Sequence, residues 1–335
     1  MPSLTRISSR SQLSEPAQHD TGLMSILLIG DFTEAEYATW CSHLLQHLPE
    51  SEPLVQADHE YDKRAVKVAL VANPPARTLS SLPNLRFIQS LWAGVDRLLS
   101  DVSLPPSVPI ARLIDPAMTQ AMVECAIAQV FYLHRQLPTY LKQQSDRTWR
   151  QLTQPLASER SVGVLGLGAL GYPVARALAE LGFPVAGWSL HQRKDTTIES
   201  HHGTNGLVRV ASRSRILINL LPLTSLTAGI LNESLFRQLP IGAALMNLAR
   251  GEHLVEQDLL AALDGQRLSH AVLDVFNPEP LPANHPFWAH PQITVFPHAA
   301  ATTDPATAAR IASDNIAAFL AGRNVSGLVL RSRGY

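Results

Sequence analysis

Three short motifs in the second half of the chain each present a residue that could do acid/base chemistry, in a largely apolar setting. Arg250 stands in NLARG, Glu279 in DVFNPEPLP and His298 in VFPHAA. An arginine can grip a carboxylate with two parallel N–H donors, and a histidine exchanges protons near neutral pH. A carboxylate bonded to the other ring nitrogen stabilises the charged imidazole. This set predicts acid/base chemistry on a small substrate that carries a carboxylate beside a carbonyl, such as reduction of a 2-oxo acid.

Each of these residues also has a purely structural interpretation. Arg250 could bridge two domains, Glu279 could cap a turn, and His298 could be a buried histidine with satisfied hydrogen bonds, which is the better interpretation for any lone histidine. All three follow expected strands, and the carboxyl ends of strands in open α/β sheets are where ligands bind. Their joint occurrence therefore favours the catalytic interpretation.

A glycine-rich segment indicates a dinucleotide site. Residues 161–171 read SVGVLGLGALG, an apolar run followed by GxGxxG, and residues 174–181 form an amphipathic pattern that stops at Gly182. A bare GxGxxG is weak evidence and can be a structural turn, but a strand before it and a helix after it make the signal strong. The first glycine permits a tight turn, the second lets the backbone approach a pyrophosphate, and the third lets the helix pack on the strand. The predicted cofactor residues here are Gly166, Gly168, Ala169, Leu170 and Gly171.

The segment after the next expected strand predicts which dinucleotide binds. An NAD site usually presents an acidic residue there, whereas this chain reads GWSLHQRK and has no carboxylate before Asp195. Ser189, Arg193 and Lys194 can instead donate to a 2′-phosphate. NADPH is therefore predicted, with NADH as a weaker possibility. The alternative is that Arg193 and Lys194 form a solvated pair in a loop.

Short apolar runs alternate with longer amphipathic segments from residue 25 onward, which is the pattern of βαβ units and parallel sheets. The candidate strands of a first series are 26–29, 66–71, 86–90 and 109–111. Those of a second series are 161–165, 184–188, 216–220, 243–247, 269–274 and 293–295. The fold class predicted is α/β with two doubly wound parallel-sheet domains.

Two long helical stretches, 118–133 and 305–320, are interpreted as the crossings between these domains. The first domain is then discontinuous, with residues 24–120 and 300–335 forming a substrate-binding domain. Residues 121–299 form the inserted dinucleotide-binding domain. Residues 1–23 are rich in Ser, Thr, Gln, Arg and Pro. They are expected to be a disordered extension, with an organelle transit peptide as the less favoured alternative.

Composition restricts the partners. The 335 residues carry a formal net charge of −1, which gives no electrostatic reason to expect nucleic acid or an acidic membrane surface. There is no run of about 18 apolar residues of the kind that spans a membrane. Cys41 and Cys125 lack the spacing of a zinc site or disulfide framework, which suggests a reducing cytoplasm.

Four further histidines have no predicted chemistry. His201 and His202 lie in a polar stretch and are expected to be solvated, while His285 and His290 flank prolines in a loop. No metal-ligand spacing connects them, so no metal site is predicted.

Several motifs taken together resemble the D-isomer-specific 2-hydroxyacid dehydrogenase family, and within it the glyoxylate/hydroxypyruvate reductase A branch. They include LWAGVD at 91–96, LPLTSLTAGIL at 221–231 and PHAAATT at 297–303. The resemblance runs from about residue 24 to the end. It implies a Rossmann coenzyme domain inserted into a flavodoxin-like substrate domain, a homodimer, and reduction of small 2-oxo acids to D-2-hydroxy acids.

The resemblance also implies roles for individual residues. Arg250 matches the substrate-binding arginine, His298 the acid/base and Glu279 its partner. The backbone N–H groups of Ala93 and Gly94 match a loop that holds the substrate carboxylate. Further residues implied or expected around the two ligands are Trp92 at the substrate pocket and Leu221, Pro222, Ala249 and Asp274 at the cofactor.

Two other functions stay open from the sequence. One is a dehydrogenase of a bulkier 2-oxo acid, because residues 71–75 read VANPP and lack the bulky aromatic expected after that strand in the reductase branch. The other is a dinucleotide-sensing binding protein on the same fold, since a fold alone does not fix a function. A pure binder would have no need to keep Arg250, Glu279 and His298 together, which favours an enzyme.

Overall fold

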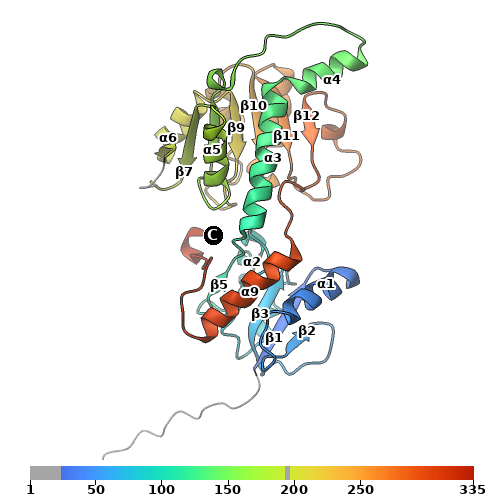
Figure 1. Ribbon diagram of the computed structural model, residues 1–335, viewed down its shortest axis with the longest axis vertical. Coiled ribbons are helices and arrows are strands. Elements are labelled where there is room, and N and C mark those ends of the chain that lie inside the picture. Colours follow the sequence, from blue (N-terminus) through green and yellow to red (C-terminus); the bar gives the residue numbers. More distant parts are fainter. Residues whose placement is uncertain (1–23, 193–196) are drawn as a thin grey trace, which may run out of the picture.

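The computed structural model describes residues 24–192 and 197–335. The expectation for residues 1–23 and the roles given to Arg193 and Lys194 therefore lie outside the described residues. Within them the chain forms two parallel sheets, one of five strands and one of seven, which Figure 1 shows as the lower and upper parts of the molecule. The predicted fold class is confirmed.

The five-stranded sheet has the order β2-β1-β3-β4-β5, with every pairing parallel. Its strands are β1 (Ser25–Gly30), β2 (Leu54–Gln56), β3 (Val66–Ala72), β4 (Phe87–Ser90) and β5 (Ile110–Ala111). β1, β3 and β4 are almost wholly buried, because helices or loops cover both faces.

The seven-stranded sheet has the order β12-β11-β10-β9-β6-β7-β8 and is also parallel throughout. Its strands are β6 (Val162–Leu165), β7 (Val185–Ser189), β8 (Glu199–His202), β9 (Ile216–Asn219), β10 (Ala243–Asn247), β11 (Leu268–Leu273) and β12 (Ile293–Val295). The strand order reverses at β6: β7 and β8 are added on one side of β6, and β9 to β12 are added on the other side. Such a switch point is where open α/β sheets bind their ligands.

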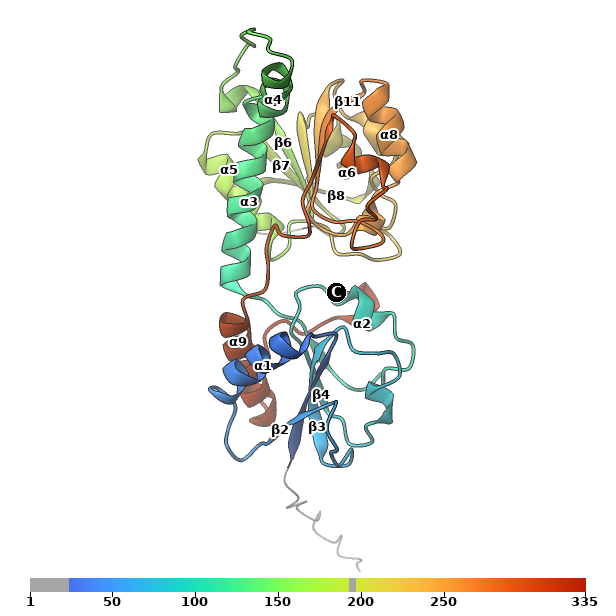
Figure 2. The same ribbon diagram turned by 90° about the vertical axis from the view of Figure 1, so that its right-hand side faces the viewer.

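The helices cover both faces of each sheet. Their bounds are α1 (Glu34–Leu45), α2 (Asp96–Leu99), α3 (Pro116–His134), α4 (Leu137–Ser145), α5 (Gly171–Glu180), α6 (Gly203–Ala211), α7 (Glu233–Gln238), α8 (Glu256–Asp264) and α9 (Pro305–Leu320). α3 and α5 share one core with the seven-stranded sheet, and α6, α7 and α8 share a second core on its other face. In Figure 2 these two groups lie on opposite sides of that sheet.

The two expected crossings are not equivalent. Met118 at the start of α3 belongs to the core of the lower domain, whereas Met122 and the residues after it belong to the upper core, so α3 does bridge the domains. The buried apolar residues Ala308, Ala309, Ala312 and Ile316 of α9 pack in the core of the lower domain. The expectation that α9 is itself a crossing is therefore wrong, because the chain crosses in the extended segment before it. Both helices follow an Asp N-cap with a Pro, and Thr307 Oγ1 donates to Asp115 Oδ2 at 2.6 Å, which ties the starts of α3 and α9 together.

Two strands were absent from the sequence prediction. β2 has three residues and β8 carries two histidines, so neither shows an apolar run. The expectation that His201 is solvated is wrong. Its side chain is only 15% exposed in β8 and its Nε2 lies 2.8 Å from Oε1 of Glu199. His202 is exposed.

Three further features concern possible partners. Of the helices in the described parts of the chain, none has both the length and the apolar character needed to cross a bilayer. The described residues also contain no group of three or more His, Cys, Asp or Glu side chains arranged to hold a metal ion. Cys41 and Cys125 are free thiols.

Candidate active site

The three acid/base candidates emerge from one edge of the seven-stranded sheet. Arg250 follows the end of β10, Glu279 lies in the loop after β11, and His298 follows β12. These strands are neighbours and run parallel, so their carboxyl ends share an edge. The structure therefore brings the three residues to the same edge.

His298 and Glu279 form a direct pair. Nδ1 of His298 lies 2.8 Å from Oε2 of Glu279, while Oε1 of the same carboxylate accepts the backbone N–H of Phe276 at 2.9 Å. The imidazole is 51% exposed, so Nε2 remains available on the solvent side of the ring. A ring whose Nδ1 faces a carboxylate has its proton exchanged through Nε2. The arrangement suits a proton donor to a bound carbonyl.

The backbone at His298 is unusual for a side chain with a Cβ atom. Its φ is 52°, in the left-handed region. The conformation is held from Asp274, whose carbonyl accepts the N–H of His298 and whose carboxylate accepts those of Ala299 and Ala300. Asp274 is 2% exposed, and this burial raises the pKa of its carboxyl group. The structure thus gives Asp274 the task of shaping the His298 loop, beside the cofactor role implied by resemblance.

Arg250 reaches across to the other domain. Its Nε donates to Oδ1 of Asp96 at 3.0 Å and its Nη1 donates to the carbonyl of Ala249 at 2.7 Å. A Cβ atom added to Gly94 would lie 1.5 Å from Nη2 of Arg250. The guanidinium group therefore rests directly on Gly94, and only glycine leaves room for it.

The loop beneath Arg250 offers backbone donors. In the described residues the N–H groups of Ala93 and Gly94 donate to no other group. They lie beside a guanidinium that is 30% exposed, an arrangement that attracts a carboxylate. The ring of Trp92 is half-buried and packs edge-on against Phe32 and Trp40, with centroids 6.5 and 6.1 Å away. Its expected contact with a substrate stays a prediction.

Each of the three glycines of the cofactor loop is explained by a different feature of its surroundings. Gly166 has φ +95°, and a Cβ there would lie 2.6 Å from the Leu220 carbonyl oxygen. A Cβ at Gly171 would lie 1.8 Å from the carbonyl oxygen of Gly166, so helix and turn touch there. Gly168 is the exception, since nothing lies within 4 Å of its added Cβ. No protein neighbour explains this glycine, which fits an approach by a ligand.

Backbone donors surround the open position. Among the described residues, the N–H groups of Gly168, Ala169 and Leu170 have no acceptor, and α5 begins immediately after them. The N–H of Tyr172 in the first turn of α5 already donates to the carbonyl of Gly168, so the donors left for phosphate oxygens are the N–H groups of Gly168, Ala169 and Leu170 at the helix N-terminus. Leu221, Pro222 and Ala249 follow the ends of the neighbouring strands β9 and β10. A dinucleotide fits this site.

The candidate 2′-phosphate site is described only in part. Ser189 ends β7, and its hydroxyl donates to the carbonyl of His191 at 2.7 Å, so that hydrogen is engaged in the loop and not free as expected. With its hydrogen engaged, this hydroxyl can only accept a further hydrogen bond, whereas a phosphate needs donors. Arg193 and Lys194, the other two residues predicted to bind the 2′-phosphate, lie outside the described residues.

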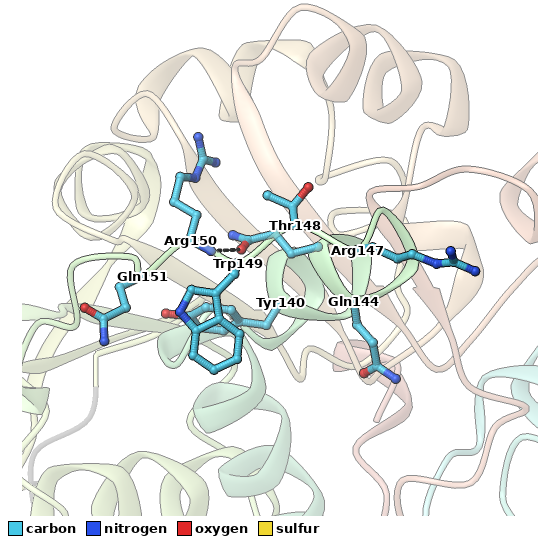
Figure 3. A pocket seen from close by; sticks show the side chains of 8 residues that line it. Tyr140, Gln144, Arg147, Thr148, Trp149, Arg150 and Gln151 are labelled. Atoms are coloured by element: carbon cyan, nitrogen blue, oxygen red, sulfur yellow. Dashed lines mark hydrogen bonds between the residues drawn. The ribbon is translucent and has the colours of Figure 1, made fainter.

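A cavity of about 510 Å³ lies elsewhere, between α4 and the loop that follows it. Figure 3 shows the indole of Trp149 beside Tyr140 at this place. In Figure 1 α4 projects from the far end of the upper domain, away from the domain junction. The cavity is therefore separate from the candidate active site.

Four polar residues that shape the site have no role that the sequence predicts. Asp96 ends the LWAGVD motif, where no chemistry is expected of it. Asn219, Asn247 and His253 are completely buried beneath Arg250. The available signal was that the apolar strands ILIN and AALMN both end on an asparagine, because a buried amide at a strand end must have hydrogen-bond partners.

Known proteins resemble the chain over nearly its whole length. Residues 127–300 match the NAD binding domain of D-isomer specific 2-hydroxyacid dehydrogenases. A solved D-isomer specific 2-hydroxyacid dehydrogenase from Xanthobacter autotrophicus Py2, in complex with NADPH and MES, is 36% identical with a TM-score of 0.88, covering 93% of this chain and 99% of that one.

Two further solved structures are similar. An NADPH-dependent glyoxylate/hydroxypyruvate reductase from Sinorhizobium meliloti, with NADP and sulfate, is 32% identical with a TM-score of 0.86, covering 93% of this chain and 100% of that one. A probable 2-hydroxyacid dehydrogenase from Rhizobium etli CFN 42, with NADP, HEPES and L(+)-tartaric acid, is 30% identical with a TM-score of 0.85 and the same coverage. With its fold, its cofactor loop and its Arg-Glu-His set, this chain belongs to the D-isomer-specific 2-hydroxyacid dehydrogenase family.

Proposed function

We propose that the protein is an NADPH-preferring reductase of small 2-oxo acids, such as glyoxylate and hydroxypyruvate, and that it forms D-2-hydroxy acids. The observation that carries this proposal is the convergence of two features at one domain junction. The His298–Glu279 pair supplies a proton donor, and Arg250 lies over Gly94 with free backbone N–H groups beside it.

The substrate carboxylate binds to the N–H groups of Ala93 and Gly94 and to the guanidinium of Arg250. Asp96 occupies Nε and Ala249 occupies Nη1, so Nη2, directly over Gly94, is the donor left to face the substrate. Because these groups come from both domains, binding of the carboxylate draws the domains together and excludes water.

The carbonyl oxygen of the substrate then faces His298. A bound nicotinamide coenzyme supplies a hydride to the carbonyl carbon. Nε2 of His298 gives its proton to the carbonyl oxygen, and the carboxylate of Glu279 stabilises the charged imidazole before that transfer. Arg250 stabilises the negative charge that develops on the oxygen.

A nicotinamide coenzyme would be held at the switch point of the seven-stranded sheet, at the ends of β6 and β9. The N–H groups of Gly168, Ala169 and Leu170 would hold its pyrophosphate, and Leu221, Pro222, Ala249 and Asp274 would hold its nicotinamide half. Two of the similar proteins were solved with NADP and one with NADPH, which supports the same choice here.

The coenzyme preference is tested by changing Arg193 and Lys194 together to alanine. Charge-assisted contacts to a phosphate contribute roughly ten- to a hundredfold each when well placed. We expect KM for NADPH to rise by about tenfold or more, and NADH kinetics to change little. Arg209→Ala, an exposed arginine of α6 in the same domain, is the matched control. An equal loss with both coenzymes would show that the loop supports the fold and does not bind the phosphate.

We also propose a homodimer in the cytoplasm. The region around α4 exposes several large apolar side chains, among them Trp149 at 96% and Leu141 at 56%. Figure 3 shows Trp149 in this region. Such a patch is typical of an interaction surface. The two free thiols suit a reducing compartment. Sedimentation equilibrium of the whole chain tests the assembly state, and a monomer would contradict it.

A further inference from the structure

A buried polar layer lies under the candidate active site and takes no part in the proposed proton transfer. It consists of Asn219 at the end of β9, Asn247 at the end of β10, and His253 three residues after Arg250. All three side chains are completely buried. Buried polar groups of this kind are costly unless they are fully bonded, so their partners indicate what they hold in place.

The hydrogen bonds fix the orientation of each group. Oδ1 of Asn219 accepts the N–H of Leu221 at 3.3 Å, so its amide nitrogen faces the other way. That nitrogen donates to Oδ1 of Asn247 and to Nδ1 of His253, both at 3.0 Å. Nδ1 of His253 is therefore an acceptor, and the ring proton lies on Nε2.

Two sets of hydrogen bonds lead out of this layer, and we call them its arms. One arm ends at Pro222, on the coenzyme side. Nε2 of His253 donates to the carbonyl of Pro222 at 3.3 Å. The same carbonyl also accepts the hydroxyl of Thr227 at 2.7 Å. Pro222 lies in the loop that we place beside the nicotinamide half of the coenzyme, so His253 helps to hold that loop at its position.

The other arm ends on the substrate side. Nδ2 of Asn247 donates to the carbonyl of Arg250 at 2.9 Å, and its Oδ1 accepts the N–H of Ala249 at 3.3 Å. The backbone N–H of His253 also donates to the carbonyl of Arg250, at 3.3 Å. The backbone that carries Arg250 is thus bonded to the side chain of Asn247 and to the backbone N–H of His253, and Asn219 links the side chains of these two residues.

We propose that His253 is a positioning residue that couples coenzyme binding to the grip of Arg250 on the substrate carboxylate. Its ring stands between the two arms, so a shift of the Pro222 loop is transmitted through His253 and Asn219 to the segment of Arg250. The inference rests on the proposed function, because it assumes that the two loops bind a nicotinamide coenzyme and a 2-oxo acid.

The coupling depends on a neutral imidazole at His253. Burial lowers the pKa of His253, and the positive charge of Arg250 acts in the same direction. The hydrogen bond to Pro222 and the carboxylate of Asp96 oppose it. A second ring proton would point at the amide nitrogen of Asn219, which is itself a donor. The layer therefore keeps its hydrogen-bond pattern only with a neutral imidazole.

Two variants separate the two arms. In His253→Asn the amide oxygen stands near the place of Nδ1 and keeps the acceptor for Asn219, but the donor to Pro222 is lost. In His253→Gln the amide nitrogen stands near the place of Nε2 and keeps that donor, but the acceptor for Asn219 is lost. We expect His253→Asn to raise the Kd of NADPH roughly tenfold with a smaller change in KM for glyoxylate. We expect the reverse split for His253→Gln.

The control is the same pair of substitutions at His285. This histidine is also largely buried in the same domain and bonds to Glu256 at 3.2 Å, away from the strand edge. Its variants should lower Tm without separating Kd from KM. If the His253 variants raise both constants by one common factor, or leave both unchanged, His253 is merely structural and the proposal is wrong.

A binding measurement keeps the test independent of turnover. The Kd of NADPH is measured with and without oxamate, an unreactive carboxylate analogue of a 2-oxo acid. We expect oxamate to tighten NADPH binding in the wild type and to lose most of this effect in both His253 variants. A wild type that binds both ligands but does not reduce glyoxylate would refute the proposed substrate, while coupling through His253 would still be measurable.

Thr227 provides a second route if the His253 variants do not fold. Thr227→Val removes the other donor to Pro222 at nearly constant volume, and Thr227→Ser keeps the hydroxyl. We expect the valine variant to raise the Kd of NADPH severalfold and to weaken the effect of oxamate, while the serine variant resembles the wild type. An unchanged Kd and an unchanged oxamate effect in Thr227→Val would remove the Pro222 loop from the coupling and overturn the proposal.

Discussion

Two layers of the same sheet edge use histidine in opposite ways. The rim is the set of loops after β10, β11 and β12 that carry Arg250, Glu279 and His298. There His298 is half exposed, stands beside a carboxylate and has a left-handed backbone. Below the rim, His253 is completely buried, accepts from an amide and donates to a carbonyl. His270 on β11 is also buried and bonds to the hydroxyl of Thr294 at 2.8 Å.

The difference shows that surroundings, and not residue type, decide what a histidine does. His298 stands beside a carboxylate with half of its side chain exposed, which suits the proton donor of the proposed reaction. Burial lowers the pKa of both His253 and His270, which favours neutral rings that act as fixed hydrogen-bonding groups. In our proposal the rim carries the chemistry, and the layer of Asn219, Asn247 and His253 below it maintains its geometry.

The largest effect is expected from His298→Gln at the rim. Glutamine cannot deliver a proton to the carbonyl oxygen, so kcat should fall by about 10² to 10⁴. NADPH binding should persist, because the cofactor loop is untouched. Steady-state kinetics and NADPH titration measure the two effects. A kcat close to that of the wild type would remove His298 from the reaction.

Arg250→Lys should be the next most severe change. Lysine offers a point charge in place of the planar fork, and it cannot donate to both Asp96 and a substrate in the same geometry. We expect kcat/KM for glyoxylate to fall by roughly ten- to a hundredfold, with losses in both constants. Tolerance of lysine would mean that the Ala93–Gly94 loop alone recognises the carboxylate.

His270 gives the comparison a stability test. Burial lowers its pKa to about 4, below the ordinary value of 6.5, so between these pH values the unfolded chain binds a proton that the folded chain does not. The free energy of unfolding should therefore decrease as pH falls from 6.5 to 4, by on the order of 3 kcal/mol from this residue. Denaturant unfolding of His270→Gln should show a flatter dependence in that window. Parallel curves for variant and wild type would contradict the assignment.

Glu279→Gln should have the smallest effect on the maximal rate. The amide still orients the ring but no longer stabilises the imidazolium of the proposed reaction. The pH profile for 2-oxo acid reduction should therefore move, while much of the activity is retained. A profile that keeps its position would make Glu279 a structural residue.

The sequence predicted that the rim residues share one strand edge, but it did not predict the layer below. Arg250, Glu279 and His298 could be placed there because each follows an apolar strand, and their catalytic roles stay predictions. Gly166 and Gly171 could be predicted because a Cβ at either would meet the backbone of the turn, while the role of Gly168 at a ligand stays a prediction. Both cases depend on local sequence.

Asp96 and His253 could not be assigned because their roles arise from contacts between segments far apart in the chain. Asp96 meets Arg250 across 154 residues, and His253 meets Asn219 across 34. β8 was missed for a related reason, since its ESHH sequence becomes a strand only by pairing with β7. Tertiary context overrides local propensity at such sites.

The most direct test of the account is the rate of NADPH oxidation by the whole chain with glyoxylate and hydroxypyruvate, measured beside NADH and beside bulkier 2-oxo acids. The account predicts turnover with the two small acids, a preference for NADPH, and the D enantiomer as the product of hydroxypyruvate. Tight NADPH binding without turnover of any 2-oxo acid would contradict it, and would identify a dinucleotide-binding protein that uses the same fold without its chemistry.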